Sequence, residues 1–415
     1  MKYTLYLVPL LLIIFSCSEI KEEPQNPLLS GDESNNDDLM QIKTVNSKDT
    51  SGFEFQVNYL EFDTLVYSTN YIYVGNNNDP NYGNLSLYSA IRLVPYNNDY
   101  NTNYEIENVK KILGAHLNLY GYSNSFDKDS SKTLDIQLLE LSKSTSFSTL
   151  TLKMVPETNP VPVGDTSFSN NVRGYFNIPI TDTNYVRKVL TYNSKSSTSA
   201  DYNNNIFGFL IKANNTFTSK TQGFYGYGTS YEPTMVFDII VEKDGVQDTI
   251  VADFTIEASN QLSSFVKLGD WNLNDPQSKD KVKVVNFSGI RAKISFPTKK
   301  IIPANASIYS ASFSISADTL ISSWSNSNLL RWYGSTSVNG FVSPFDTRSL
   351  SDGNYKFYIN SWVQFWSLND TNNGFFLVSP YESSSVENFT LNLNSVDPLK
   401  KANLEIIYSE RPVKK

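Results

Sequence analysis

Short runs of alternating apolar and polar residues, each ended by a cluster of Asn, Gly, Pro or Asp, fill the chain from Ser51 onward. Successive side chains of a strand point to opposite faces, so this period of two predicts half-buried β-strands separated by turns. The runs that predict strands most clearly are 71–74, 115–119, 135–141, 207–211 and 235–241. Only 183–190 predicts a helix, of one or two turns. Short strands with frequent turns favour an all-β, antiparallel sandwich over βαβ units.

The same landmarks recur in the same order along the chain, which indicates an internal repeat. The matched stretches are 114–119 with 310–315, 175–178 with 355–359, and 208–211 with 374–377. We therefore predict two tandem, diverged copies of one sandwich, over residues 51–256 and 257–411. Each copy is long enough to bury its own core without disulfide bonds.

The N-terminus carries an apolar run, residues 3–15, that follows Lys2 and ends at Ser16-Cys17. The run has the length of a signal-peptide core and is too short for a stable transmembrane anchor. Cys17 is the only cysteine of the chain, so it cannot form an internal disulfide. The pattern resembles the lipobox of bacterial lipoproteins, which implies a signal peptide over 1–16 and lipid attachment at Cys17. An ordinary secretory signal followed by a free cysteine is the alternative.

Residues 17–50 hold eight acidic residues, three lysines and few apolar residues. This composition predicts a flexible acidic tether. Lys21-Glu22-Glu23 resembles the export signal of surface lipoproteins of the Bacteroidota, with a plain solvated tether as the alternative. We therefore expect an outer-membrane protein that faces the cell exterior and contacts the membrane through Cys17. The net charge of −8 argues against a nucleic-acid partner.

Further landmarks lie at 81–83, 90–93, 233–239, 290–296, 302–313 and 402–408. These stretches resemble the DNRLRE family of exported β-sandwich domains, although the motif that gives the family its name is absent. The resemblance covers most of residues 60–410. It implies a jelly-roll sandwich similar to carbohydrate-binding modules of surface proteins and polysaccharide-degrading enzymes.

Candidate catalytic and metal-binding residues are few. His116 is the only histidine, and a single strand histidine is more typical of a hydrogen-bonded surface residue than of a general base. The sequence has no Gly-x-Ser-x-Gly motif and no His or Cys cluster for zinc, so we predict no catalytic residue, no metal site and no enzyme. A polysaccharide-cleaving pair of carboxylates stays a third alternative. Asn76–Asp79 and Asp127–Asp129 predict plain turns, with structural calcium left open and no other cofactor expected.

Aromatic residues next to glycine or at strand ends give the best functional indication, because sugar rings stack on flat aromatic side chains. The carbohydrate-binding candidates are Trp332, Tyr333, Tyr225 and Tyr227. Structural packing of these side chains is the alternative, and Trp362 and Trp366 are predicted to lie in a core. The sequence thus predicts a non-catalytic surface lipoprotein that binds polysaccharide. A structural or adhesive protein that binds surface proteins is the second candidate.

Overall fold

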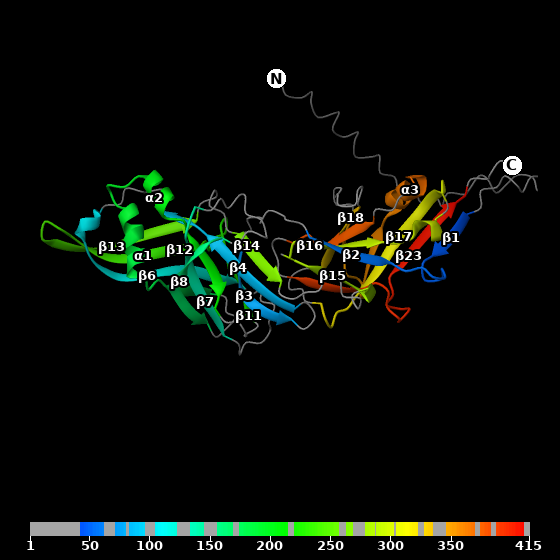
Figure 1. The fold of residues 1–415 in the computed structure, drawn as a ribbon, viewed down its shortest axis with the longest axis horizontal. Coiled ribbons are helices and arrows are strands. Elements are labelled where there is room, and N and C mark those ends of the chain that lie inside the picture. Colours follow the sequence, from blue (N-terminus) through cyan, green and yellow to red (C-terminus); the bar gives the residue numbers. More distant parts are fainter. Residues whose placement is uncertain are drawn as a thin grey trace, which may run out of the picture.

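The computed structural model of the chain describes most of the sequence from residue 42 onward. The described residues are 42–61, 71–79, 83–95, 104–122, 133–144, 156–168, 174–214, 220–256, 263–268, 279–286, 288–302, 304–322, 328–334, 346–369, 374–382 and 387–410. Within them the strands are antiparallel and the helices are few and short (Figure 1). The predicted all-β sandwich class is confirmed.

One group of strands, which we call the N-terminal set, lies between residues 71 and 256. It contains β3 (Tyr71–Asp79), β4 (Gly83–Ile91), β5 (Leu93–Pro95), β6 (Val109–Tyr122), β7 (Leu134–Leu141), β8 (Thr158–Phe168), β9 (Gly174–Pro179), β10 (Phe209–Ala213), β11 (Lys220–Tyr225), β12 (Thr234–Lys243) and β13 (Val246–Ile256). Strands β3-β11-β6-β9 are neighbours in one layer and β4-β10-β7-β8 in the other, with the β3–β4 pairing joining the two. This is the strand order of a jelly roll.

The second group, the C-terminal set, begins at residue 281. It contains β15 (Lys281–Val285), β16 (Ile290–Ser295), β17 (Ser307–Ala317), β18 (Leu329–Gly334), β19 (Asp346–Ser349), β20 (Asn354–Tyr358), β21 (Phe375–Val378), β22 (Asn388–Asn392) and β23 (Asn403–Ser409). Its layers are β15-β22-β17-β20 and β16-β21-β18-β19. The eight strands that form the two layers therefore share one connectivity in the two sets.

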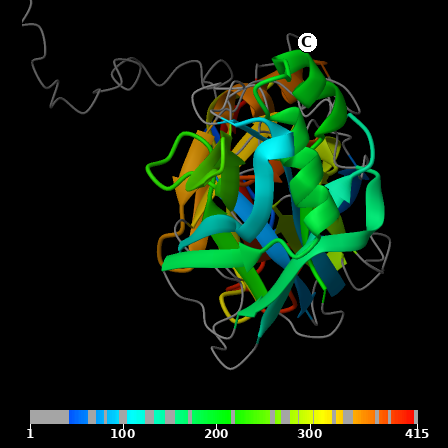
Figure 2. The same ribbon diagram turned by 90° about the vertical axis from the view of Figure 1, so that its left-hand side faces the viewer.

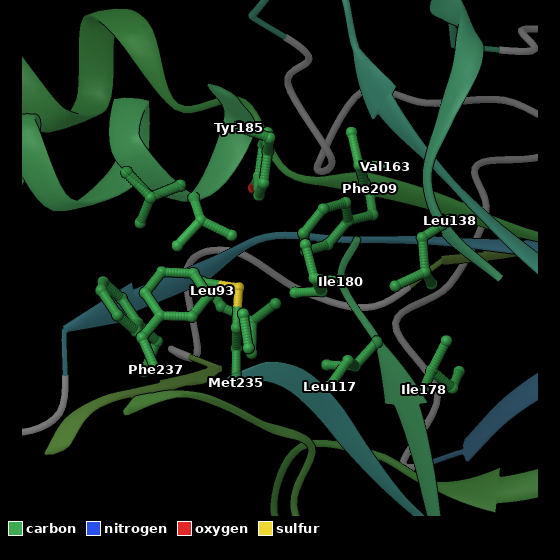
Figure 3. Packing of buried hydrophobic residues seen from close by; sticks show 14 of the residues in the cluster. Leu93, Leu117, Leu138, Val163, Ile178, Ile180, Tyr185, Phe209, Met235 and Phe237 are labelled. Carbon is green, nitrogen blue, oxygen red and sulfur yellow. The ribbon is translucent and has the colours of Figure 1, made fainter. Parts of the chain in front are cut away.

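Strand register places core residues of the two sets at corresponding positions. Phe209 pairs with Ile91 in the N-terminal set, as Phe375 pairs with Ile294 in the C-terminal set. The corresponding buried pairs are Ile72 and Val282, Ile91 and Ile294, Leu117 and Phe313, Leu138 and Trp332, Phe209 and Phe375, and Phe224 and Leu391. Figure 3 shows Leu117, Leu138 and Phe209 converging in the first core. The apolar positions thus specify two separate cores of the same design.

The same irregularity interrupts both long central strands. The β6–β12 register skips one residue at Leu113, and the β17–β23 register skips one at Tyr309. Both bulged side chains are exposed. Just beyond each bulge a backbone hydrogen bond is repeated, from Ile180 N to Ala115 O and from Ile359 N to Ala311 O. Because both sets have a bulge at the corresponding position, the bulge is a regular feature of this fold rather than a local defect.

The predicted repeat holds for two matched stretches and is shifted in the third. Residues 114–119 and 208–211 correspond to 310–315 and 374–377 as predicted. In the third stretch Phe176 corresponds to Tyr355, one residue away from the predicted match. Alternation alone does not fix register, because a slip of one residue between two strands still leaves a period of two.

The edge strands do not follow the predicted boundaries. β2 (Gln56–Glu61) pairs with β16 of the C-terminal set, whereas β14 (Ser263–Leu268) pairs with β4 of the N-terminal set. β1 (Ile42–Asn46), placed in the predicted tether, pairs with β23. In Figure 1 the blue β1 and β2 lie beside the yellow-to-red strands. The expected ranges 17–50, 51–256 and 257–411 are therefore wrong for these three strands.

Helices close the same end of each set. α1 (Thr183–Tyr192) and α2 (Ser199–Asn205) follow β9 and lie together in Figures 1 and 2, and α3 (Asn360–Asn369) follows β20. The Asp182 carboxylate caps α1 by accepting hydrogen bonds from Asn184 N at 2.9 Å and Tyr185 N at 3.3 Å. Short 3-10 helices span Ile106–Asn108 and Thr298–Lys300. The predicted helix at 183–190 is confirmed, whereas α2 and α3 were not predicted.

Two further predictions concern polar turns and tryptophans. Asn76–Asp79 is part of β3 and pairs with 83–86, so the prediction of a turn at these residues is wrong. Asp127–Asp129 lies outside the described residues. Trp362 and Trp366 are buried in the second core as predicted, but they reach it from α3.

Candidate functional site

Trp332 lies in the centre of the second core. Its side chain is 0% exposed and packs edge-to-face on Trp362, with ring centroids 5.8 Å apart. It occupies the position that Leu138 holds in the N-terminal set, and β18 alternates so that Leu330, Trp332 and Gly334 point inward. The prediction that Trp332 forms a sugar-binding face is wrong, because the ring is enclosed.

The other three predicted aromatics are not brought together. Tyr333 is half-buried on the opposite face of β18, next to Phe376 of β21. Tyr227 is half-buried and packs against the first core. Tyr225, in contrast, belongs to a group of tyrosines on the outer face of the N-terminal set.

That group, here called the tyrosine cluster, crosses four neighbouring strands and one loop. Its members are Tyr71 on β3, Tyr120 on β6, Tyr175 on β9, Tyr225 on β11 and Tyr231 in the β11–β12 loop. The neighbouring positions Leu119, Phe176 and Phe224 point into the core. Because side chains alternate along each strand, the tyrosines lie on the solvent side of the same layer.

The rings of the cluster hold one another in fixed orientations. Tyr120 is central: Tyr231 stacks on it with centroids 4.1 Å apart and planes 18° apart, and Tyr175 meets it edge-to-face at 4.9 Å. Tyr225 lies 5.9 Å from Tyr120 and 6.0 Å from Tyr71. Each such pair contributes about 0.5–1.5 kcal/mol beyond burial. The cluster is therefore a rigid aromatic surface.

Two rings of the cluster are available to a ligand. Tyr175 is 74% exposed and Tyr231 is 41% exposed, whereas the other three are half-buried beneath and beside them. The half-buried rings support the exposed ones and fix their tilt.

The loop that carries Tyr231 is tied down by short-range hydrogen bonds. Gly228 N donates to Glu232 Oε1 at 2.8 Å, Thr229 Oγ1 donates to Gly226 O at 2.9 Å, and Tyr231 N donates to Thr229 Oγ1 at 3.3 Å. Gly228 has a φ of 79°, a conformation that favours glycine. Tyr231 is thus positioned before any ligand arrives, which limits the entropy lost on binding.

A row of polar residues lies beside the tyrosine cluster on the same layer. Asn118 of β6 is paired with Asn177 of β9 on one side and with Thr234 of β12 on the other. Asn118 Nδ2 donates to Thr234 Oγ1 at 3.4 Å. Amide and hydroxyl groups next to exposed rings can hydrogen-bond to ligand hydroxyl groups.

The single histidine lies one row further along, next to two carboxylates. His116 pairs with Val236, and Asp253 of β13 pairs with the same valine. Partial burial raises the pKa of Asp253, the nearby Asp238 raises it further, and His116 lowers it. The predicted absence of an enzyme stays a prediction.

Three further features would bear on metal and membrane binding: a metal site, a membrane-spanning helix and the predicted lipidation site at Cys17. Within the described stretches, no group of three or more His, Cys, Asp or Glu side chains is arranged to hold a metal ion. No helix in the described part of the chain is both long and apolar enough to cross a membrane. Cys17, the predicted lipidation site, lies outside the described residues.

Sequence reasoning found one member of the tyrosine cluster and missed four. The four come from 71, 120, 175 and 231, far apart in the chain. Tyr120 and Tyr175 alternate with apolar residues along their strands, and this alternation was the only sequence pattern that indicated an outward-facing position for them.

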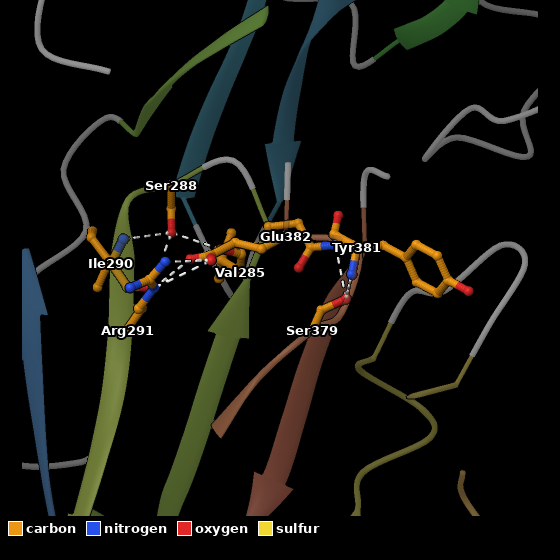
Figure 4. A network of polar contacts seen from close by, with 8 residues as sticks. Val285, Ser288, Ile290, Arg291, Ser379, Tyr381 and Glu382 are labelled. Atoms are coloured by element: carbon orange, nitrogen blue, oxygen red, sulfur yellow. Dashed lines mark hydrogen bonds and ion pairs between the residues drawn. The ribbon is translucent and has the colours of Figure 1, made fainter. Parts of the chain in front are cut away.

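The two arginines in the stretches that resemble DNRLRE domains have different places in the fold. Register makes Arg92 correspond to Ser295 rather than to Arg291. Arg291 donates from Nε to Glu382 Oε1 at 2.9 Å and from Nη2 to Glu382 Oε2 at 2.8 Å (Figure 4). This two-pronged ion pair ties β16 to the segment after β21, which is a structural role.

No family model matches the chain. No curated protein matches it either. The resemblance to the DNRLRE family therefore stays a prediction.

Proposed function

We propose that the protein is a non-catalytic glycan-binding module whose binding face is the tyrosine cluster. The observation that carries this proposal is the pair of exposed rings, Tyr175 and Tyr231, which pack on half-buried Tyr120, Tyr231 also on Tyr225. An exposed ring presents a flat apolar surface to the C–H face of a sugar. The row Asn177, Asn118 and Thr234 supplies polar groups for the hydroxyls.

We also propose that the chain is exported and anchored in the outer membrane through lipid on Cys17, facing the exterior. The apolar run at 3–15, Ser16-Cys17 and the acidic segment that follows support this location. Cys17→Ser is expected to abolish incorporation of a labelled fatty acid and to release the protein from the membrane fraction. Labelling that persists in this variant would contradict the anchor.

The binding proposal is tested on residues 18–415, which retain every described residue. Binding of neutral and acidic polysaccharides is screened on an array and quantified by calorimetry for each hit. Tyr175→Ala and Tyr231→Ala are each expected to weaken binding at least about 10-fold, as loss of an aromatic anchor does elsewhere. Tyr381→Ala removes another exposed tyrosine, 40% exposed and on the C-terminal set, and is the matched control.

The outcomes separate the candidate functions. Binding that is lost in the cluster variants and kept in Tyr381→Ala supports the glycan module. Binding that all three variants retain places the site elsewhere and refutes the tyrosine cluster. An absence of glycan binding in the parent protein favours the structural or adhesive alternative.

A further inference from the structure

The face of the C-terminal set that corresponds to the tyrosine cluster has different chemistry. Register assigns the positions of Tyr175, Tyr120, Tyr225 and Tyr71 to Asn354, Ser316, Asn392 and Lys281, respectively. Asn392 Nδ2 donates to Ser316 Oγ at 3.0 Å, so polar side chains replace the rings. The same layer of the fold therefore carries aromatic side chains in one set and polar side chains in the other, where Ser316 and Asn392 are buried and Asn354 is exposed.

A groove of about 620 Å³ lies on this polar face. Its floor includes Lys356 of β20, Ser314 of β17 and Asn403 of β23, which are register neighbours across three strands. The β19–β20 segment forms one wall. The turn after β1, which carries Lys48, and the loop before β23 form the other wall.

Cations outnumber acids in this groove, although the chain as a whole has a net charge of −8. Lys48, Arg348 and Lys356 line it, against a single lining carboxylate, Asp352. Cations gathered in a concave site attract anions more strongly than the same charges spread over a flat surface.

Arg348 is held in place while its terminal nitrogens remain available. Its Nε donates to Asp346 Oδ2 at 2.7 Å, and its guanidinium carbon lies 5.0 Å from the Tyr358 ring centroid. Among the described residues neither terminal nitrogen has a hydrogen-bond partner. A guanidinium fixed through Nε presents its remaining donors in the planar geometry that suits carboxylate or sulfate oxygens.

The two lysines differ in how they are held. Lys48 Nζ donates to Pro398 O at 2.7 Å, which points its ammonium toward the groove wall. Lys356 Nζ lies 5.8 Å from the Tyr358 ring centroid and has no ion-pair partner among the described residues. Lys356 is thus a cation whose charge the described part of the fold leaves uncompensated.

We propose that this groove binds the anionic group of an acidic sugar, either a carboxylate or a sulfate ester. Arg348 and Lys356 bind the anion directly, Ser314 and Asn403 donate to neighbouring hydroxyls, and Lys48 adds to the positive field. The choice of a sugar as carrier rests on the proposed function, whereas the preference for an anion rests on the groove alone.

Three tetrasaccharides test the proposal on residues 18–415: tetragalacturonate, a sulfated galactan tetrasaccharide and neutral galactotetraose. Lys356→Gln and Lys48→Gln are compared with Lys110→Gln, which removes an exposed cation from β6. We expect Lys356→Gln to weaken binding of an acidic tetrasaccharide at least about 10-fold and Lys48→Gln to weaken it less. Binding of galactotetraose should not change, and the acidic ligand should bind more weakly at high salt.

The results distinguish this proposal from the previous one. Acidic binding lost in Lys356→Gln but kept in Tyr175→Ala supports the groove even if no neutral glycan binds anywhere. Acidic binding kept in Lys356→Gln and lost in Tyr175→Ala overturns the groove and supports the tyrosine cluster. Binding of only the carboxylate or only the sulfate ligand identifies the anion. Failure of both acidic ligands to bind the parent protein overturns the inference.

Discussion

Gly374 allows a backbone contact that no other residue permits, and its loss should destabilise the C-terminal set. Its φ is +76°, and a Cβ added there would lie 2.5 Å from the Ile294 carbonyl oxygen. Ile294 is on β16, which pairs with β2 and β21, so the carbonyl cannot move without disturbing two pairings. The left-handed backbone costs an alanine about 1–2 kcal/mol. Forcing the contact apart adds about 1–3 kcal/mol.

Gly353 provides the matched control. Its φ is also +76°, but an added Cβ meets nothing within 4 Å. Alanine has fewer accessible conformations than glycine in the unfolded chain, which offsets about 0.4–1 kcal/mol of the destabilisation in both variants. We therefore expect Gly353→Ala to cost about 0–1.6 kcal/mol and Gly374→Ala about 1–4.6 kcal/mol.

Urea unfolding followed by tryptophan fluorescence measures both changes, because Trp332, Trp362 and Trp366 lie in the affected core. Gly208→Ala, with a φ of +101° and a Cβ 2.1 Å from Ile91 O, should destabilise the N-terminal set in the same way. Equal destabilisation by Gly374→Ala and Gly353→Ala would refute the close-contact argument and leave only the backbone conformation.

Two further predictions concern the N-terminal segment and the carboxylate next to His116. Phe55→Ala should cost about 3–5 kcal/mol, because Phe55 packs edge-to-face on Phe313 with ring centroids 5.4 Å apart. The urea midpoint reported by the C-terminal tryptophans should therefore fall. The neighbouring Glu54→Ala should change this midpoint little, and an unaltered midpoint in Phe55→Ala would contradict the placement of this segment. Asp253→Asn should raise the melting temperature at neutral pH. The raised pKa means that the folded state binds the proton more tightly than the unfolded chain, so ionisation lowers stability as pH rises above the ordinary value of 3.8. The gain should vanish below that pH, and a gain that is independent of pH would argue against this cause.

The strands and the repeat could be predicted because they follow from local alternation and from landmarks in one order. The partners of the edge strands β2 and β14 could not, because the alternation of residues along a strand does not indicate which set the strand joins. Pairing between distant strands depends on register and on chain connections, which a period of two does not encode.

The candidate site shows the same limit. Trp332 and Tyr333 are neighbours in sequence, and which of them is buried depends only on how β18 pairs with β21. The tyrosine cluster could not be predicted from the sequence for a related reason. Its members are separated by up to 160 residues in sequence and become neighbours only through the β9-β6-β11-β3 order.

Comparison of corresponding positions shows where the two sets are free to differ. Inward positions remain apolar in both, as Leu138 and Trp332 do, because a polar side chain there would lose its hydrogen bonds to water. Outward positions carry no such constraint, and Tyr175 corresponds to Asn354. A solvent-facing layer can therefore exchange a tyrosine for an amide at one position, and Asn177 for Lys356 at the next outward position, at little cost to the fold. If the two faces bind different parts of one acidic glycan, Tyr175→Ala and Lys356→Gln should each weaken binding, and the double variant should lose more than either single change.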